Sequence, residues 1–410
     1  MHISFDFSRR RLRIMNTDKT ILHCDMNGFF ASVEMLARPD LAGQPVAVSG
    51  DPDLRHGIIL AKNEPAKKFG VSTGETIWSA RRKCPDLVLL EAHHDLYAKY
   101  SRLANGIYFR FTDRVEPFGI DESWLDVSAS KSLHGDGKTI ADKIRQTIKN
   151  ELNLTVSVGV SYNKVFAKLA SDYKKPDATT VFGRTAVEKI VHKLPVGAML
   201  FVGRSSADAL RKMGILTIGD LAACPEGVLV RKFGKHGALM KKYALGEDDS
   251  PVAEYGAVEQ IKSVGNSITF RRDICGADDI KKGFTLVAEK LSARMRRKGV
   301  LGRTLHIVVK RADFSVITRQ VRLPFALNDT PELVKSACAC AGEVSGGAAK
   351  IRMLGITCSD LVFESAPHQE DLFAERDEKA RKRESVFFDI RSSFGAGAIK
   401  RADMLDCDLE

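Results

Sequence analysis

The sequence predicts an α+β chain of several domains, and three observations predict it. The length of 410 residues allows roughly two to four domains of about 100 to 200 residues each. Alternating apolar segments, typical of strands, and three-residue apolar spacings, typical of helices, are mixed over residues 19–183 and again after residue 261. Between these two regions, residues 184–249 have a Lys-rich helical pattern that Gly residues interrupt.

The first region predicts a ferredoxin-like α/β layer with an inserted subdomain. After an extension of residues 1–18, in which Met15 is a candidate start, a strand runs to Asp25 and a helix begins at Phe29. Short strands and a helix that ends at Gly70 then form a small mixed subdomain. The remaining elements are a helix at 94–112, a strand at 115–127, a helix at 137–151 and a strand at 154–161.

The second region predicts another α/β domain behind a linker around Pro251. Its expected strands lie at 262–272, 303–311, 314–323 and 351–363, and its expected helices at 278–298 and 330–343. The last forty residues are charged and poor in long apolar runs, so we expect a mobile tail with one helix at about 381–393.

Composition narrows the class of protein. The formal charge of +11 favours a polyanionic partner such as nucleic acid, although many basic proteins bind no particular anion. No apolar run approaches the roughly 18 residues of a membrane span, so we expect no membrane association. The eight cysteines form no CxxC pair, which fits reduced thiols in a cytoplasm.

Two adjacent acids, Asp121 and Glu122, stand inside an apolar run and need a counter-charge. Together with Asp25 they could meet on neighbouring strands and bind a pair of hard divalent ions, Mg²⁺ or Mn²⁺. Neighbours on a regular strand face opposite ways, so the adjacent acids can share a site only at a hairpin turn or a bulge. The alternative interpretation is a solvated strand end with unrelated acids.

Three segments resemble the Y-family DNA polymerases, and the DinB branch is the most similar. The first is His23–Glu34 (HCDMNGFFASVE), the second is Ile120–Asp126 (IDESWLD), and the third runs from Ser157 through Asp172 to Lys175-Pro176. They occur in the family's order, and the resemblance extends from about residue 20 to at least residue 365.

The resemblance implies a right-hand polymerase with a ferredoxin-like palm, small fingers, a helical thumb and an α/β little finger. On this basis we expect the palm at 19–28 and 93–183, the fingers at 29–92, the thumb at 184–249, a linker at 250–261, the little finger at 262–366 and a tail at 367–410. The thumb and the little finger would bind DNA, and residues 262–272 would lie along its backbone.

The activity implied is low-fidelity translesion DNA synthesis by two-metal-ion nucleotidyl transfer, without a proofreading exonuclease. Asp25 and Asp121 would bridge both ions, Glu122 would help to hold the ion at the primer 3′-hydroxyl, and the Met26 carbonyl would be a further ligand. The partners implied are primer-template DNA and deoxynucleoside triphosphates. Two alternatives are a UmuC-like subunit that needs a partner and a catalytically silent, clamp-bound DNA-binding protein.

Phe30 matches the family position that lies beneath the incoming sugar and excludes a 2′-hydroxyl, although it could also be an ordinary core aromatic. Phe29, Lys67 and Lys175 match positions that contact the triphosphate. Lys67 stands where arginine is usual, which keeps the charge but not the bidentate fork. Glu64 and Ala61 replace the usual tyrosine and threonine, and Glu64 would repel the triphosphate unless it points away or pairs with Lys62 or Lys68.

In two further regions we expect contacts with a binding partner. In the thumb, Phe201-Val202-Gly203-Arg204 lacks the usual second glycine, and six basic residues are available either for phosphates or as a solvated helix face: Lys212, Arg231, Lys232, Lys235, Lys241 and Lys242. In the tail, Gln369–Phe373 resembles a pentapeptide that docks on the sliding clamp (the beta subunit), with Gln369, Leu372 and Phe373 as its contacts. We expect a monomer.

Overall fold

The computed structural model describes residues 19–51, 57–257, 261–342, 349–365, 378–395, 397–405 and 407–409, with side chains in the last helix defined from residue 382. The chain divides into two compact units, one ending near Ala257 and one containing the residues beyond it together with Gly50–Ile58. The predicted extension and the clamp-like pentapeptide lie outside the described residues.

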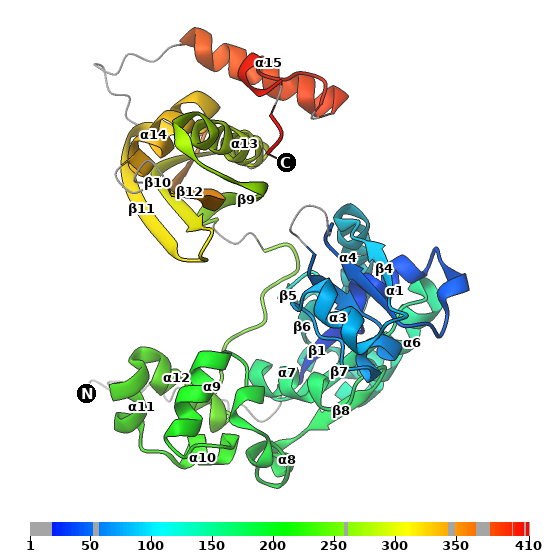
Figure 1. The fold of residues 1–410 in the computed structure, drawn as a ribbon. Helices are drawn as coiled ribbons and strands as arrows, with labels where there is room; N and C mark the ends of the chain where they lie inside the picture. Colours follow the sequence, from blue (N-terminus) through cyan, green and yellow to red (C-terminus); the bar gives the residue numbers. More distant parts are fainter. Residues whose placement is uncertain are drawn as a thin grey trace, which may run out of the picture. The chain divides into compact units, whose positions relative to one another are not determined.

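The first unit is built on a five-stranded sheet with the order β5-β6-β1-β7-β8 (Figure 1). Its strands are β1 (Ile21–Met26), β5 (Val115–Pro117), β6 (Glu122–Asp126), β7 (Val156–Ser161) and β8 (Thr179–Phe182). Every residue of β1 and β7 is buried, because helices cover both faces of the sheet.

Two helices, α4 (His94–Phe109) and α6 (Gly137–Leu152), pack on one face of this sheet. The other face is covered by α7 (Lys164–Tyr173), which approaches β7 closely at Gly159. A Cβ atom on Gly159 would lie 2.0 Å from the Ala167 carbonyl oxygen, so only glycine allows this approach. Helix α7 is thereby held over the same sheet face to which His23 points.

A small subdomain is inserted between β1 and α4. A three-stranded sheet of order β3-β2-β4 packs with short helices, and its core includes Ala47, Ile59 and Ala80. The elements are α1 (Phe29–Met35), a 3₁₀ turn (Pro39–Leu41), β2 (Val46–Ser49), β3 (Ile59–Lys62), α2 (Glu64–Lys68), α3 (Ile77–Lys83) and β4 (Val88–Glu91).

Residues 184–249 form what we call the helical subdomain. Its core includes Leu210, Leu221 and Met240 and is continuous with Phe166 and Leu169 of α7, so this subdomain packs directly on the helix that covers the five-stranded sheet. The helices are α8 (Arg184–Lys189), α9 (Arg204–Lys212), α10 (Ile218–Ala223), α11 (Glu226–Phe233) and α12 (Lys235–Ala244). Shorter elements of the first unit are α5 (Lys131–His134) and 3₁₀ turns at Ser128–Ser130, Val191–Lys193 and Val196–Ala198.

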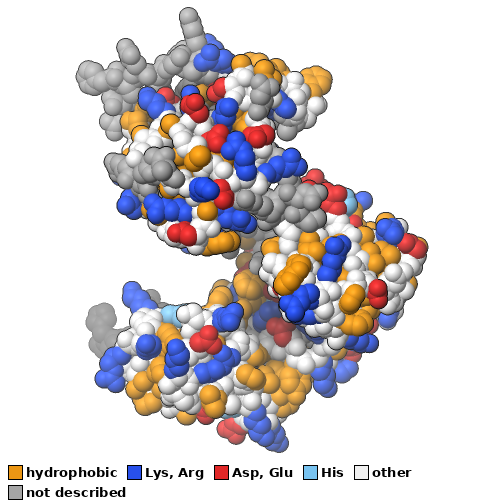
Figure 2. Space-filling model, in the orientation of Figure 1, with side chains coloured by type: hydrophobic (Ala, Val, Ile, Leu, Met, Phe, Trp, Pro, Cys, Tyr) orange, Lys and Arg blue, Asp and Glu red, His pale blue; other side chains and the backbone are white. Residues whose placement is uncertain are grey.

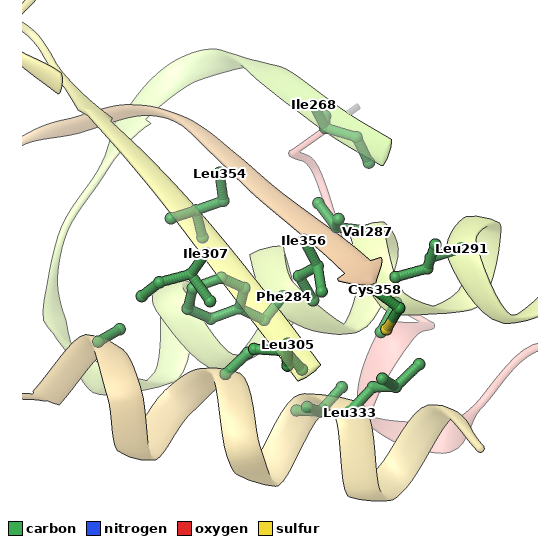
Figure 3. Packing of buried hydrophobic residues seen from close by; sticks show 14 of the residues in the cluster. Ile268, Phe284, Val287, Leu291, Leu305, Ile307, Leu333, Leu354, Ile356 and Cys358 are labelled. Atoms are coloured by element: carbon green, nitrogen blue, oxygen red, sulfur yellow. The ribbon is translucent and has the colours of Figure 1, made fainter. Parts of the chain in front are cut away.

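The second unit is an antiparallel sheet of order β11-β10-β12-β9 with helices packed on it. Figure 3 shows its core, where Phe284 and Leu291 of α13 and Leu333 of α14 meet inward side chains of the strands such as Leu305 and Ile356. The elements are β9 (Ser263–Ile274), α13 (Gly276–Arg297), β10 (Val300–Arg311), β11 (Val316–Leu327), α14 (Thr330–Gly342) and β12 (Ile351–Phe363).

The C-terminal residues correct the prediction of a mobile tail. Helix α15 (Glu378–Phe394) and a 3₁₀ turn (Ala402–Met404) belong to the second unit, where Arg391 and Arg401 form ion pairs with Glu289 of α13 at 3.0 and 2.9 Å. Leu409 is buried in the core, and its carbonyl oxygen accepts a hydrogen bond from the Arg271 amide at 3.3 Å. These residues are therefore part of the domain.

The predicted α+β, multidomain fold class is confirmed by the two units and their three sheets. No helix in the described part of the chain is both long and apolar enough to cross a membrane.

Candidate active site

The two strand segments predicted to carry the acids are neighbours in the sheet. Asp25 on β1 lies directly opposite Glu122 on β6 in the antiparallel register, so both side chains share one face. Asp121 precedes β6 in the loop 118–121 that joins it to β5, and its carbonyl oxygen accepts a hydrogen bond from the Met26 amide at 3.0 Å. The alternation of side chains therefore ends at Asp121, at a hairpin turn, as a shared site requires.

Two lysines supply the counter-charge. Lys168 Nζ on α7 donates hydrogen bonds to Asp25 Oδ2 at 2.8 Å and to Glu122 Oε1 at 2.7 Å. Lys175 Nζ lies 2.8 Å from Asp25 Oδ2 and 2.8 Å from Asp172 Oδ1. Both ammonium groups are largely buried, which strengthens their attraction to the carboxylates.

The acids respond differently to this environment. Burial alone would raise the pKa of Asp25, but the ammonium groups of Lys168 and Lys175 lower it to about 2. Burial raises the pKa of Glu122 to about 7, with repulsion from Asp25 adding to the effect and the hydrogen bond from Lys168 opposing it. Burial and then repulsion from Asp25 also raise the pKa of Asp121. One strongly ionised acid therefore stands beside two that are harder to ionise.

The acids are not already drawn together as a ligand cluster. Within the described ranges, no three His, Cys, Asp or Glu side chains are arranged closely enough to hold a metal ion. Like charges repel at short range, and Asp25 and Glu122 turn instead to Lys168. A divalent ion would have to take over the carboxylate oxygens that the lysines now contact.

A buried histidine lies beneath Glu122. His23 is fully buried, its Nδ1 is 2.9 Å from Ser171 Oγ, and its Nε2 is 3.8 Å from Glu122 Oε2. Burial, followed by repulsion from Lys168, lowers the pKa of His23 well below its usual value. The ring is therefore neutral and packs edge-on to Trp124, with the ring centroids 5.4 Å apart.

Phe30 lies at the start of α1, the first helix after the strand that carries Asp25. Its ring stacks on Tyr97 of α4 with a centroid distance of 4.0 Å and an interplanar angle of 12°. The Tyr97 hydroxyl donates to Glu34 and accepts from the His93 amide at 3.1 Å, which fixes the ring under Phe30. Phe30 is therefore held from one side and remains partly exposed.

Comparison with known proteins identifies the family of this chain. Residues 24–172 match the impB/mucB/samB family, and residues 261–372 match the C-terminal domain of that family. The chain is 45% identical over 390 residues to a protein named DNA polymerase IV of Acetivibrio thermocellus, covering 94% of this chain and 98% of that protein. It is 36% identical to DNA polymerase IV 1 of Bacillus subtilis, covering 94% and 93% of the two chains. The chain belongs to the Y-family DNA polymerases.

A solved structure shares the fold of this Y-family chain. The structure, a Y-family DNA polymerase chimera Dbh-Dpo4(243-245)-Dbh, superimposes with a TM-score of 0.74 at 23% identity, covering 84% of this chain and 99% of the chimera. The family predicted from the three sequence segments is confirmed by the family match and by the two relatives named DNA polymerase IV, and the solved structure shows the shared fold.

The predicted triphosphate residues do not all reach the acids of this Y-family chain. Lys175 reaches them, because its Nζ contacts Asp25. Phe29, the first residue of α1, is buried in the core. Lys67 lies on α2, where its Nζ contacts Glu64 Oε1 at 3.3 Å. Glu64 therefore pairs with Lys67 itself, and this exposed pair partly neutralises the lysine predicted for the triphosphate.

Several contacts around the acids were not predicted from the sequence, although His23, Asn27 and Lys168 stand in the segments that resemble the family. Lys168 was given no role, yet Lys164, Lys168 and Asp172 follow a four-residue helical spacing that places them on one face of α7. The Asn27 side chain donates a hydrogen bond to Ser157 Oγ at 2.9 Å and accepts one from the Asp177 amide at 2.8 Å. The contacts of His23 and Tyr97 had no sequence pattern that could have revealed them.

The basic residues of the helical subdomain divide into two groups. Lys212 and Lys232 line a shallow surface pocket with Arg204. Lys241 instead donates to the carbonyl oxygens of Ala222 and Cys224 at 2.8 and 2.5 Å, at the end of α10. Lys241 thus has a structural role, and Figure 2 shows other Lys and Arg side chains spread over this subdomain.

Proposed function

We propose that this chain is a low-fidelity translesion DNA polymerase that adds deoxynucleotides to a primer 3′ end on a DNA template. The observation that carries the proposal is the placement of Asp25 opposite Glu122 on adjacent strands, with Asp121 in the hairpin loop just before Glu122, in a chain whose relatives are named DNA polymerases. The ammonium groups of Lys168 and Lys175 balance the negative charge of these acids. A metal-dependent site likewise needs cations to balance its carboxylates.

We infer a divalent-metal site from family membership and from the donors present. Carboxylate oxygens of Asp25, Asp121 and Glu122 and the Met26 carbonyl would hold two Mg²⁺ ions, which Mn²⁺ can replace. When bound, the ions supply charge neutralisation at the attacking 3′-hydroxyl and at the departing pyrophosphate. Two ammonium groups at 2.7–2.8 Å from the carboxylates support the fit, because this place already requires positive charge.

The other residues of this site bind and orient substrate. Lys175, already beside Asp25, would turn to the triphosphate, and Lys67 would have to leave Glu64 to reach it, whereas the Phe29 side chain is buried. Phe30, held rigidly on Tyr97, would exclude a 2′-hydroxyl because a fixed ring cannot move aside. We assign the five-stranded sheet as the palm, the inserted subdomain as the fingers, the helical subdomain as the thumb and the second unit as the little finger.

The proposed partners follow from charge and from the family. A net charge of +11 supports binding to primer-template DNA mainly through phosphates. We further propose a monomer that acts in the cytoplasm and docks on the sliding clamp through Gln369, Leu372 and Phe373.

Primer extension by the purified protein tests this function. With Mg²⁺, a primed template and each deoxynucleotide in turn, we expect template-directed extension that also passes a damaged template base and leaves no exonuclease products. Extension only after a second protein is added would favour a UmuC-like subunit. DNA binding without any extension would favour a silent DNA-binding protein, and either result would overturn the proposal.

A further inference from the structure

One exposed residue between the palm and the thumb has an unfavourable backbone conformation. Phe201, which precedes α9, has φ +65, in the left-handed region that bulky side chains rarely adopt. Its side chain is 48% exposed, so burial of the ring does not explain why a glycine is not used here. Strained residues of this kind persist where the surrounding structure holds them, often close to functional sites.

Two contacts hold Phe201 in place on the side of the helical subdomain. Its carbonyl oxygen lies 3.1 Å from His236 Nε2 of α12, and its ring is 5.9 Å from that of Tyr243 on the same helix. Both contacts come from one helix, so the backbone and the ring of Phe201 are fixed together.

On its other side, Phe201 reaches the hairpin that carries Asp121. The rings of Phe201 and Phe118 meet edge to face, with centroids 6.5 Å apart and an interplanar angle of 86°. Phe118 in turn packs on Trp124 of β6 at 4.4 Å. Phe118 is the first residue of the loop 118–121, and its amide donates to the Glu122 carbonyl oxygen at 2.9 Å.

A second set of contacts brings the same two regions together. Trp124 is buried in a small apolar cluster with Ile21 and Val252, and Leu200, the residue before Phe201, packs against this cluster. The segment that bears Phe201 is therefore joined to the sheet both through aromatic rings and through aliphatic burial.

We propose that Phe201 is a positioning residue of the thumb, whose ring, through Phe118, holds the hairpin that carries Asp121. This inference rests on the proposed polymerase function. The left-handed backbone of Phe201 directs its ring toward Phe118, and Phe118 is three residues from Asp121. The thumb thereby takes part in placing a catalytic carboxylate that it does not itself supply.

The test compares Phe201→Gly with wild type at saturating DNA and nucleotide. Glycine removes the backbone strain and the ring together, so the variant should melt no lower than wild type. We expect its single-turnover incorporation rate to fall about two- to tenfold, the range given by one aromatic pair, and the Mg²⁺ concentration for half-maximal rate to rise. Phe201→Tyr keeps the ring, so its incorporation rate and its Mg²⁺ concentration for half-maximal rate should both stay near the wild-type values.

The chain provides a matched control. Phe314 of the second unit also has a left-handed φ of 66 and is 60% exposed, so Phe314→Gly removes the same kind of strain elsewhere. It should leave the Mg²⁺ midpoint unchanged. Phe118→Leu should lower the rate at least as much as Phe201→Gly, because it also changes the contact with Trp124. The double variant should be no slower than Phe118→Leu alone, because the Phe201–Phe118 contact is already lost in that variant.

Independent losses in the double variant, or a Phe201→Gly rate equal to that of wild type, would overturn the positioning role. A change confined to DNA affinity, with an unchanged saturating rate, would overturn it as well. Each of these outcomes leaves the polymerase function intact, because wild type still extends the primer. Absence of extension by wild type itself would instead refute the proposed function.

Discussion

At the scale of single residues, Lys168 determines the resting state of the acidic site. It contacts Asp25, Glu122 and Asp172, whereas Lys175 contacts Asp25 and Asp172, so removal of Lys168 takes away the ammonium partner of Glu122. We expect Lys168→Met to lower the free energy of unfolding by about 2–3 kcal/mol without metal, somewhat less than for a fully unpaired buried charge. Mg²⁺ should restore most of this loss, as thermal melts with and without a chelator would show.

Lys164→Met is the matched control for this prediction. Lys164 lies on the same helix and pairs with Glu116 at 2.6 Å, away from the three acids. Its removal should also destabilise the protein, but Mg²⁺ should not restore that loss. Equal responses of the two variants to Mg²⁺ would mean that Lys168 does not occupy a cation site.

The raised pKa of Glu122 predicts pH-dependent metal binding. A proton on Glu122 competes with a metal ion, so affinity should fall as the pH drops through about 7, the pKa of this half-buried carboxyl. A group with this pKa is about tenfold less ionised at about pH 6 than at about pH 8, which gives about a tenfold weaker affinity. Calorimetric Mn²⁺ titrations would measure it. A wild-type pH dependence that persists unchanged in Glu122→Gln would exclude Glu122 as the titrating group.

Phe30 provides the prediction for sugar selection. Phe30→Ala should lower discrimination against ribonucleotides by at least about tenfold, because the space beneath the sugar would then admit a hydroxyl. The relative incorporation of a ribonucleotide and its deoxynucleotide measures the effect. Phe69→Ala, at an exposed ring of the same subdomain, should leave the ratio unchanged. A similar ratio in Phe30→Ala and wild type would assign Phe30 to the core.

At the scale of elements, sequence pattern predicted the need for a turn near Asp121, but the single strand expected at 115–127 is wrong, because the structure divides it into β5 and β6. Pro117 and Gly119 interrupt the alternation, and the hairpin loop lies at 118–121. The pairing of Asp25 with Glu122 depends on the register of β1 and β6, which one sequence does not determine. The contact of Lys168 with both acids depends further on how closely α7 approaches β7 at Gly159, a tertiary property.

The helical subdomain gives a prediction that separates two kinds of lysine. Lys232→Gln should weaken DNA binding and lower the slope of log affinity against log salt by about 1, as expected for one lost phosphate contact. Lys241→Gln should leave the slope unchanged and reduce stability by about 1 kcal/mol, because Lys241 binds backbone carbonyls. Salt titrations of DNA binding that gave equal slopes for Lys232→Gln and wild type would count against this phosphate contact.

At the scale of the whole molecule, the sequence predicted the α+β, multidomain fold class but not the packing of the C-terminal residues. The last forty residues lack long apolar runs, and for that reason we expected a tail. They are joined to the second unit by ion pairs to Glu289 and by the burial of Leu409, neither of which has a local pattern. Contacts between residues that lie a hundred or more positions apart in the sequence can be identified only from the structure.

The central claim is that three acids from two strands form one metal-dependent polymerase site. Single-nucleotide incorporation by Asp121→Asn, with a gel shift on the same primed DNA, tests it most directly. Asp126→Asn is the control, because Asp126 ends β6, the strand that follows Asp121, and its carboxylate accepts a hydrogen bond from the Ser128 amide outside the site. We predict that both variants bind DNA like wild type, and that Asp121→Asn alone incorporates at least about a thousandfold more slowly. Incorporation by Asp121→Asn near the wild-type rate would contradict the account.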